Sequence, residues 1–169
     1  DFDSIGDLCR RVYPDTRPWM PEELASHRHV FPEGQFVAID RETGGRVVGM
    51  CASLIVRWVD YDDLDSWDAF TPRGTFENHV AGWGRPLYAA EAIVDPTLQG
   101  HGIGGRLYEA RRALVHERHL LRIRGGSRLR GYHDHTELAV EEYVRRVVHA
   151  ELHDSTLSFQ LHQGFHVLP

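Results

Sequence analysis

Apolar residues at helical spacing predict two short helices in the first thirty positions. In the first of them, an apolar residue recurs every three or four positions: Ile5, Leu8, Cys9 and Val12. Asp3 or Ser4 can cap this helix, and Pro14 ends it. Pro21 suits the first turn of a second helix, which we expect over 21–29.

Apolar runs of strand length follow. Runs rich in Val and Ile predict strands over 35–39 and 46–58, joined by a hairpin turn at Glu42–Gly45. A third strand is expected over 87–94, after an irregular segment, 59–86, that is rich in Asp, Gly and aromatic residues. Connections of that length usually carry function, and we interpret this one as a substrate lid.

A longer helix opens the second half of the chain. An inner stripe of apolar residues predicts it from 103 to about 119: Ile103, Leu107, Ala110 and Leu114. A strand is then expected over 120–124, closed by Gly125 and Gly126. A helix that crosses between two strands indicates a mixed sheet, so the expected fold class is α/β (α+β).

The last forty residues are expected to be largely helical. A helix over 140–152 is predicted first, inside a polar stretch. A shorter helix over 155–162 follows, which Ser155 can cap. A final strand is expected to begin at Gly164.

The composition is that of an ordinary globular protein with an acidic balance. The length of 169 residues predicts one domain over 1–169, with a loop insertion at 59–86 and a helical insertion at 127–153. A net charge of −6 argues against nucleic acid as a partner. No apolar run reaches the roughly 18 residues needed to span a bilayer, which argues against a membrane partner. Cys9 and Cys51 lack metal-like spacing, and two lone thiols favour a reducing compartment, the cytoplasm.

Charge is unevenly distributed along the chain. Residues 106–130 hold eight arginines and two acids, whereas residues 60–68 hold five aspartates and no basic residue. A basic segment suits a polyanionic ligand, and an acidic segment can attract an amine. Both segments can equally be solvated surfaces, and the sequence leaves this open.

Four glycines crowd the turn between the third strand and the long helix: Gly100, Gly102, Gly104 and Gly105. A glycine-rich turn that opens a helix gathers free backbone N–H groups at the positive end of the helix dipole, and such a place binds phosphate. Three of the glycines also fit the dinucleotide fingerprint Gly-x-Gly-x-x-Gly, although five residues separate them from the strand. Dinucleotide binding therefore stays open as the weaker alternative.

The same turn resembles the acyl-CoA loop of a large enzyme family. Gln99, Gly102 and Gly104 fit the pattern Gln/Arg-x-x-Gly-x-Gly/Ala, preceded by Val-x-Pro, of the GCN5-related N-acetyltransferases. The resemblance implies a mixed, mostly antiparallel sheet with splayed fourth and fifth strands and helices on both faces. It also implies acetyl-CoA as co-substrate. The residues implied to bind it lie in the third strand and the turn: Ile93, Val94, Gln99, Gly100, His101, Gly102, Ile103, Gly104, Gly105 and Arg106.

The chain also resembles a subset of that family with a long insertion after the fifth strand, found alone or fused to a carbon–nitrogen hydrolase. Gly131–His133 and Glu141–Val144 look like part of this insertion, and Ser158–Phe165 looks like the family's late helix that ends in Gly-Phe. Gln160 departs from the family, because many members carry there a tyrosine that acts as general acid. The family's outermost strands have no counterpart in this sequence, so we expect the domain to be clipped at both ends.

Glu91 is the candidate catalytic base. It lies in an otherwise apolar strand, where burial raises the pKa of a carboxyl group toward the range that a base needs. The alternative is a carboxylate paired with an arginine. Tyr88 and His133 are candidates for substrate contact, and Tyr108 is expected at the surface. His133 and His135 could ligate a metal, but two ligands without a third favour no metal site.

These features together predict an acetyl-CoA-dependent N-acetyltransferase. It would move the acetyl group to an amine of a small molecule or peptide by direct attack in a ternary complex. The alternative is a non-catalytic acyl-CoA-binding sensor or presenting module, which Gln160 favours and Glu91 opposes. A homodimer is one option for its assembly.

Overall fold

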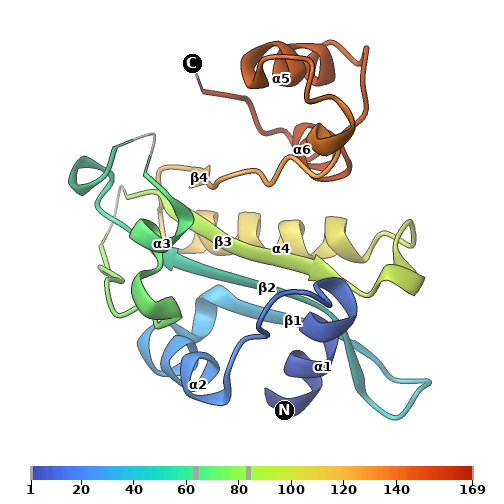
Figure 1. Cartoon of the computed structure of the whole chain (residues 1–169). Coiled ribbons are helices and arrows are strands. Elements are labelled where there is room, and N and C mark those ends of the chain that lie inside the picture. Colours follow the sequence, from blue (N-terminus) through green and yellow to red (C-terminus); the bar gives the residue numbers. More distant parts are fainter. Residues whose placement is uncertain (1, 63–64, 83–84, 169) are drawn as a thin grey trace. The chain divides into compact units, whose positions relative to one another are not determined.

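Two compact units make up the chain, residues 1–125 and residues 126–169 (Figure 1). The computed structural model describes residues 2–62, 65–82 and 85–168. The expected single domain over 1–169 stays a prediction, since two compact units can still serve as one functional domain.

The first unit is built on a four-stranded mixed sheet. Its strands are adjacent in chain order: β1 (Gln35–Asp40), β2 (Arg46–Ile55), β3 (Leu87–Val94) and β4 (Ile123–Arg124). The first three strands are antiparallel, whereas β4 runs parallel to β3. β3 and β4 pair at only two positions, the last of them Tyr88↔Arg124, and then part. The expected mixed, mostly antiparallel sheet with splayed strands is therefore confirmed.

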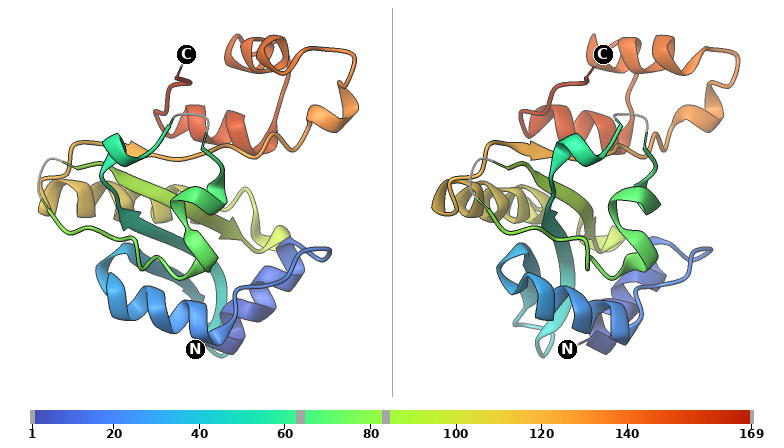
Figure 2. Two further views of the ribbon diagram at one scale, coloured as in Figure 1. Left: turned by 60° about the vertical axis from the view of Figure 1, so that its left-hand side comes forward. Right: turned by 90° about the vertical axis from the view of Figure 1, so that its left-hand side faces the viewer.

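Helices cover both faces of this sheet, as Figure 2 shows. On one face lie α1 (Phe2–Val12) and α2 (Pro21–Val30), and on the other lies α4 (Ile103–Glu117). All three helices were expected at nearly these bounds. Gly49 in β2 lets α4 come close, because a Cβ there would lie 2.9 Å from the side chain of Ile103.

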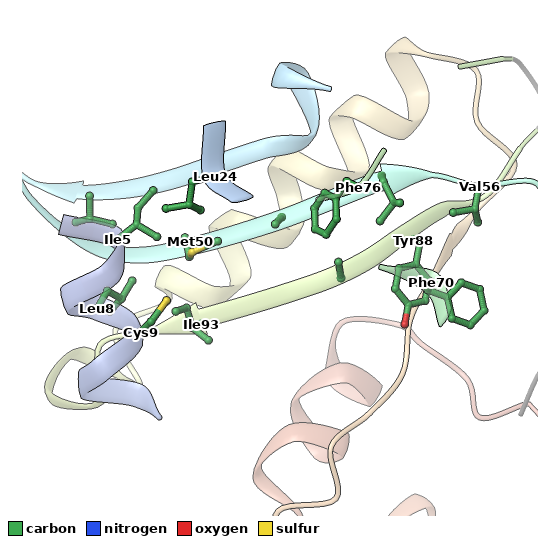
Figure 3. Close-up of a cluster of buried hydrophobic side chains, with 14 residues drawn as sticks. Ile5, Leu8, Cys9, Leu24, Met50, Val56, Phe70, Phe76, Tyr88 and Ile93 are labelled. Carbon is green, nitrogen blue, oxygen red and sulfur yellow. The ribbon is translucent and has the colours of Figure 1, made fainter. Parts of the chain in front are cut away.

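The main core lies between the sheet and the two helices α1 and α2 that cover one of its faces (Figure 3). α1 contributes Ile5, Leu8 and Cys9 to this core. Leu8 is completely buried, and truncating such a residue to alanine typically costs about 2–5 kcal/mol. Cys9 and Cys51 are both buried free thiols, so they act as small apolar residues in the packing.

The described parts of the segment 59–86 pack on this core. It contains the short helix α3 (Trp67–Phe70), and 3₁₀ turns lie at its start (η2, Trp58–Asp60) and after α3 (η3, Pro72–Gly74). Phe70 and Phe76 are buried in the core, which fixes the segment on the sheet. Four residues of the expected lid, at positions 63, 64, 83 and 84, lie outside the described residues, and the lid stays a prediction.

The end of β2 and the strand before the second unit are shorter than expected. β2 ends at Ile55, because the chain turns at Arg57 into η2. Of the strand predicted over 120–124, only the last two residues pair continuously with β3. Leu120 instead packs in the core below α4, beside Leu114.

The regular elements in the described part of the second unit are all helices, joined by loops. Its elements are η5 (Tyr132–Asp134), α5 (Val140–Val148) and α6 (Ser155–His162). α5 ends before the expected Leu152, because Ala150 adopts a left-handed φ of 59°. The strand expected from Gly164 is not seen, and residues 165–168 have no regular secondary structure.

Candidate functional site

The glycine-rich turn between β3 and α4 leaves the start of α4 uncapped. After the 3₁₀ turn η4 (Pro96–Leu98), the chain passes through Gly100 and Gly102, each with a φ of 80°. Values in this left-handed region favour glycine. Gly102 is the N-cap of α4 and offers no side-chain cap to the first-turn N–H groups. A helix of 15 residues thus presents its donors and its positive dipole end to an anion.

Gly105 is a glycine that the fold does not require. It lies in the first turn of α4, and a Cβ built on it meets nothing within 4 Å. Alanine would fit there and would favour the helix by about 0.5–1 kcal/mol. A bare backbone at this point suits a ligand that approaches α4 closely.

A shallow groove of about 750 Å³ runs along α4 from this turn. Its lining residues are mostly small and lie on one face of the helix: Gly102, Gly105, Arg106, Glu109, Ala110 and Ala113. Ala110 was expected on the inner stripe but lines the groove instead. The groove has the volume of a ligand site, with the exposed Arg106 as a cation beside the helix start.

Asp95 fastens the glycine-rich turn to the rest of the first unit. It is 1% exposed, and its carboxylate accepts hydrogen bonds from the Thr97 hydroxyl at 2.7 Å and from Arg11 Nε at 3.0 Å. The Thr97 hydroxyl lowers the pKa of Asp95, burial opposes this, and the Thr97 N–H and Arg11 add to the lowering. Asp95 was not among the residues predicted from the sequence, although an aspartate directly before a proline is a known turn signal.

A bulge in β3 decides where the candidate base points. Ala52 of β2 pairs with Glu91, whereas its neighbour Ser53 pairs with Ala89. Ala90 is therefore an extra residue, and a one-residue shift reverses the face to which each following side chain points. Glu91 is thereby turned toward the face of the sheet that carries α1.

Glu91 is half-buried there and lies within reach of α1. The Tyr13 hydroxyl donates to Glu91 Oε1 at 3.3 Å, and the backbone N–H of Ala92 donates to the same oxygen at 3.1 Å. A carboxylate with these neighbours can accept a proton from a group that approaches from the α1 side. The catalytic role of Glu91 stays a prediction.

Two tryptophans lie next to the bulge. The indole N–H of Trp67 donates to the carbonyl oxygen of Ala90 at 2.8 Å, and its ring lies 5.6 Å from that of Trp19. Trp67 is 41% exposed although one edge is fixed by this bond. Trp67, from the segment that we expected to form a substrate lid, therefore borders the region of Glu91.

The outer edge of β3 carries backbone groups that do not pair with β2. The N–H of Asp95 donates to Val48 of β2, so by alternation the backbone groups of Ala92 and Val94 point away from β2. Those of Ile93 point toward β2, and its side chain is 3% exposed in the core. Of the two predicted cofactor contacts in β3, the geometry thus favours Val94.

The structure places the candidate tyrosines inside the first unit. Tyr88 is 3% exposed and stacks on Phe70 at 4.3 Å (Figure 3). Tyr108 was expected at the surface, but it is also 3% exposed, which corrects that expectation. The reason is that the inner face of α4 is formed by positions 107, 108, 111 and 114, and position 111 is an arginine that lies 4.9 Å from the Tyr108 ring. Substrate contact by Tyr88 stays a prediction.

The remaining candidates in the first unit lie at the surface of the turn. Gln99 and His101 are exposed, and His101 Nδ1 lies 3.0 Å from the carbonyl oxygen of Gln99. Gly104 lies in the first turn of α4, half-buried, next to Gly105. All three therefore stand close to the helix start, where a phosphate would bind.

His133 and Gln160 belong to the second unit. His133 is exposed, with Nδ1 2.8 Å from the carbonyl oxygen of Arg130 and Nε2 3.2 Å from Asp134 Oδ1. Gln160 Nε2 donates to the carbonyl oxygen of Gly126 at 3.4 Å. These contacts are local, and the predicted substrate role of His133 stays untested.

Asp154 connects several segments of the second unit by hydrogen bonds. It was not predicted from the sequence. It is completely buried and caps α6 through the N–H groups of Thr156 and Leu157, so the cap is Asp154 and not the expected Ser155. Its other carboxylate oxygen accepts from the Tyr143 hydroxyl at 3.0 Å. Burial raises the pKa of Asp154, but these hydrogen bonds outweigh burial and hold the pKa below its usual value.

Two features are absent from the part of the chain that the structure describes. Within it, no three His, Cys, Asp or Glu side chains gather in a way that could hold a metal ion. Nor does any helix there combine the length and the apolar character that crossing a membrane requires.

Comparison of the sequence with known proteins gives two similar proteins of Bacillus subtilis strain 168. Probable hydrolase YhcX is 40% identical over 166 residues, which are 98% of this chain and 32% of that protein. Uncharacterized N-acetyltransferase YkwB is 31% identical over 169 residues, which are 97% of this chain and 73% of that protein. This chain thus spans about a third of YhcX and most of YkwB. No protein-family model matches the sequence.

Solved structures share the fold. The loading GNATL domain of CurA from Lyngbya majuscula has a TM-score of 0.72 at 21% identity, covering 96% of this chain and 77% of that one. The GphF GNAT-like decarboxylase in complex with isobutyryl-CoA has a TM-score of 0.67 at 22% identity, covering 96% of this chain and 80% of that one.

Proposed function

This chain belongs to the GCN5-related N-acetyltransferase family, and from that premise we propose that it is an acyl-CoA-dependent acyltransferase. Its acyl group is acetyl, and its acceptor is an amine of a small molecule or peptide. The observation that carries the proposal is the uncapped start of α4, with Gly105 bare beside an open groove. The N-acetyltransferase YkwB, to which nearly the whole chain aligns, supports the same class of reaction.

The residues at the start of α4 fit an acyl-CoA. The diphosphate would accept hydrogen bonds from the first-turn N–H groups, which lack a side-chain cap. Arg106 would add a cation, and the small residues Ala110 and Ala113 leave room for the rest of the molecule along the groove. The backbone groups of Val94, which point away from β2, would bind the amides of the pantetheine arm.

Glu91 would accept the proton that the acceptor ammonium must lose before it can attack. The amine then attacks the thioester carbon directly, and the N–H of Ala92 would donate to the carbonyl oxygen as negative charge develops on it. That N–H now donates to Glu91, so the carboxylate must turn away when the donor binds. Because Gln160 cannot act as an acid, water would protonate the departing thiolate.

The acidic segment before α3 favours a cationic acceptor. Four aspartates of this segment lie at exposed positions, before residue 63 and after residue 64: Asp60, Asp62, Asp65 and Asp68. They lie in the same segment as Trp67, which borders the region of Glu91. A field of one sign raises the local concentration of a positively charged substrate.

A non-catalytic acyl-CoA-binding module is the second candidate, and Gln160 favours it. The side chain at that position donates to a backbone carbonyl and has no acidic proton. YhcX, a protein three times as long and described as a hydrolase, contains a region like this chain. A hydrolase is therefore a candidate partner for such a module.

Release of CoA from acetyl-CoA, measured with a thiol reagent across a panel of small amines and peptides, tests the proposal. We expect at least one amine to release CoA, and Glu91→Gln to lower kcat/KM by about 100-fold or more. Glu77→Gln, an exposed acid in the same unit, serves as the matched control and should leave the rate unchanged. Binding of acetyl-CoA without release by any amine would overturn catalysis in favour of the binding module.

A further inference from the structure

A fully buried arginine lies between α4 and the sheet. Arg111 is 0% exposed and has no carboxylate partner among the described residues. Its Nη1 also lacks a hydrogen-bond partner within that part of the chain. Burying an unpaired cation is unfavourable unless other groups compensate it. The groups that contact Arg111 therefore indicate why the arginine is there.

Those groups surround the bulge in β3. Arg111 Nη2 donates to the carbonyl oxygens of Ala52, at 2.8 Å, and of Glu91. Arg111 Nε donates to the Ser53 hydroxyl at 3.0 Å. The strand register shifts between Ala52 and Ser53, opposite the extra residue of β3. The guanidinium thus contacts both strands at the point where the shift occurs.

The bulge sets the direction of the candidate base. Tyr88, Ala90 and Ile93 all contribute to the core on the α1 face. A regular strand that places positions 88 and 90 on this face would place position 91 on the α4 face. The extra residue turns Glu91 to the α1 face instead, where the Tyr13 hydroxyl contacts it.

We propose that Arg111 is a positioning residue that fixes the bulge in β3 and so holds Glu91 on the acceptor side of the sheet. The proposal rests on the proposed role of Glu91 as base. A planar guanidinium suits the task, because its fork donates to several oxygens in a fixed geometry, whereas a lysine ammonium cannot match it. Arg111 acts through backbone carbonyls and does not itself reach the reacting atoms.

Hydrogen exchange tests the link to the bulge without any assay of activity. The Trp67 indole N–H, bonded to Ala90, and the Ala92 N–H, bonded to Glu91, both report on the bulge by NMR. In Arg111→Met we expect both to exchange at least about tenfold faster, relative to core amides of α1, which corrects for any loss of global stability. Arg118→Met, at the exposed end of the same helix, is the matched control and should leave both unchanged.

Two milder variants keep the test decisive if Arg111→Met does not fold. Ser53→Ala removes one of the three hydrogen bonds, and Arg111→Lys keeps a charge without the fork. Each should speed the exchange of the two reporters by a smaller factor than Arg111→Met. Unchanged protection of both reporters in the folded Arg111 variants would overturn the proposal.

A double-mutant comparison separates positioning from general stabilisation. If Arg111 acts only through Glu91, Arg111→Lys in a Glu91→Gln background lowers kcat/KM no further than Glu91→Gln alone. If the two losses multiply, the positioning role is wrong. A wild-type chain that releases no CoA with any amine would contradict the proposed function, and the exchange experiment would still decide the role of Arg111.

Discussion

At Gly105 a side chain would stabilise the helix, whereas a bare backbone leaves space for a ligand. A Cβ there meets nothing within 4 Å, so only the absence of a side chain distinguishes it from a normal helix position. We expect Gly105→Ala to raise the free energy of unfolding by about 0.5–1 kcal/mol. Urea unfolding followed by circular dichroism measures this, with Gly6→Ala in α1 as the matched control. A loss of stability in Gly105→Ala would show that the fold does need the glycine.

Asp154 is the corresponding key residue of the second unit. Its carboxylate caps α6 and also accepts from the Gly131 N–H and the Tyr143 hydroxyl, so one side chain ties three segments together. We expect Asp154→Ala to lower the free energy of unfolding by about 2–3 kcal/mol, because it leaves several buried donors unpaired. Chemical unfolding measures the loss, and an unchanged transition would contradict this role.

Tyr143 provides a second readout of the same carboxylate. Burial, followed by the hydrogen bond to Asp154 and its charge, raises the pKa of Tyr143 to about 12. In Asp154→Asn the charge is gone while burial remains, so we expect the pKa to fall but to stay above 10, the ordinary value. A spectroscopic titration of tyrosine, compared with Tyr143→Phe to assign the signal, checks this.

At the scale of elements, the turn from β3 to α4 depends on Asp95. Asp95→Ala removes the acceptor for Thr97 and leaves Arg11 without its carboxylate partner. We expect a loss of about 1–3 kcal/mol in the free energy of unfolding. The amides of residues 97–102 should also exchange faster, while those of α2 should not. Equal exchange throughout would contradict a local anchoring role.

The elements themselves were largely predictable, because their signals are local. α1, α2, β1, β3, α4 and α6 begin or end within a residue or two of the expected positions, where periodicity is uninterrupted and Pro, Gly or Asp marks the boundary. The bulge at Ala90 was not predictable, because it exists only in the pairing with β2. The role of Arg111 was not predictable for the same reason, because its hydrogen-bond acceptors lie on other elements, β2 and β3.

The candidate site was predictable to a similar degree. The glycine turn and Glu91 follow from sequence patterns, and the structure gives both a suitable geometry. The anchoring of the turn by Asp95 and Arg11 depends on residues 84 positions apart, which no local pattern connects. Tyr108 was misplaced because the helix face was judged from apolar residues alone, without the buried arginine beside it.

At the scale of the whole molecule, the buried His27 and the half-buried His79 link stability to pH. Burial lowers the pKa of both His27 and His79 below the ordinary 6.5. The hydrogen bond with the Gly74 carbonyl and the charge of Glu23 oppose this for His27, and the charge of Glu33 opposes it for His79. The unfolded chain therefore binds more protons than the folded chain just below pH 6.5. Stability is fully present above pH 6.5 and is lost as the pH falls toward the lower folded values.

We expect the loss to approach at most about 1.4 kcal/mol per pH unit for each histidine. His79→Asn should reduce the slope of stability against pH, because it removes the imidazole that titrates. Its amide oxygen can still accept the hydrogen bond from the Ile55 N–H that Nδ1 accepts in the wild type. His116→Asn, at an exposed position of α4, is the matched control. Unfolding curves at about pH 7.5 and about pH 5.5 measure the difference, and equal slopes in wild type and His79→Asn would contradict this account.

The proposed function requires the start of α4 to bind acyl-CoA, and isothermal titration of the whole chain with acetyl-CoA measures this binding. We expect saturable binding by the wild type and at least about tenfold weaker binding by Gly105→Trp, a change of about 1.4 kcal/mol. Arg41→Trp, in the exposed turn between β1 and β2, should bind like the wild type. No binding by the folded wild-type chain, or undiminished binding by Gly105→Trp, would contradict the account.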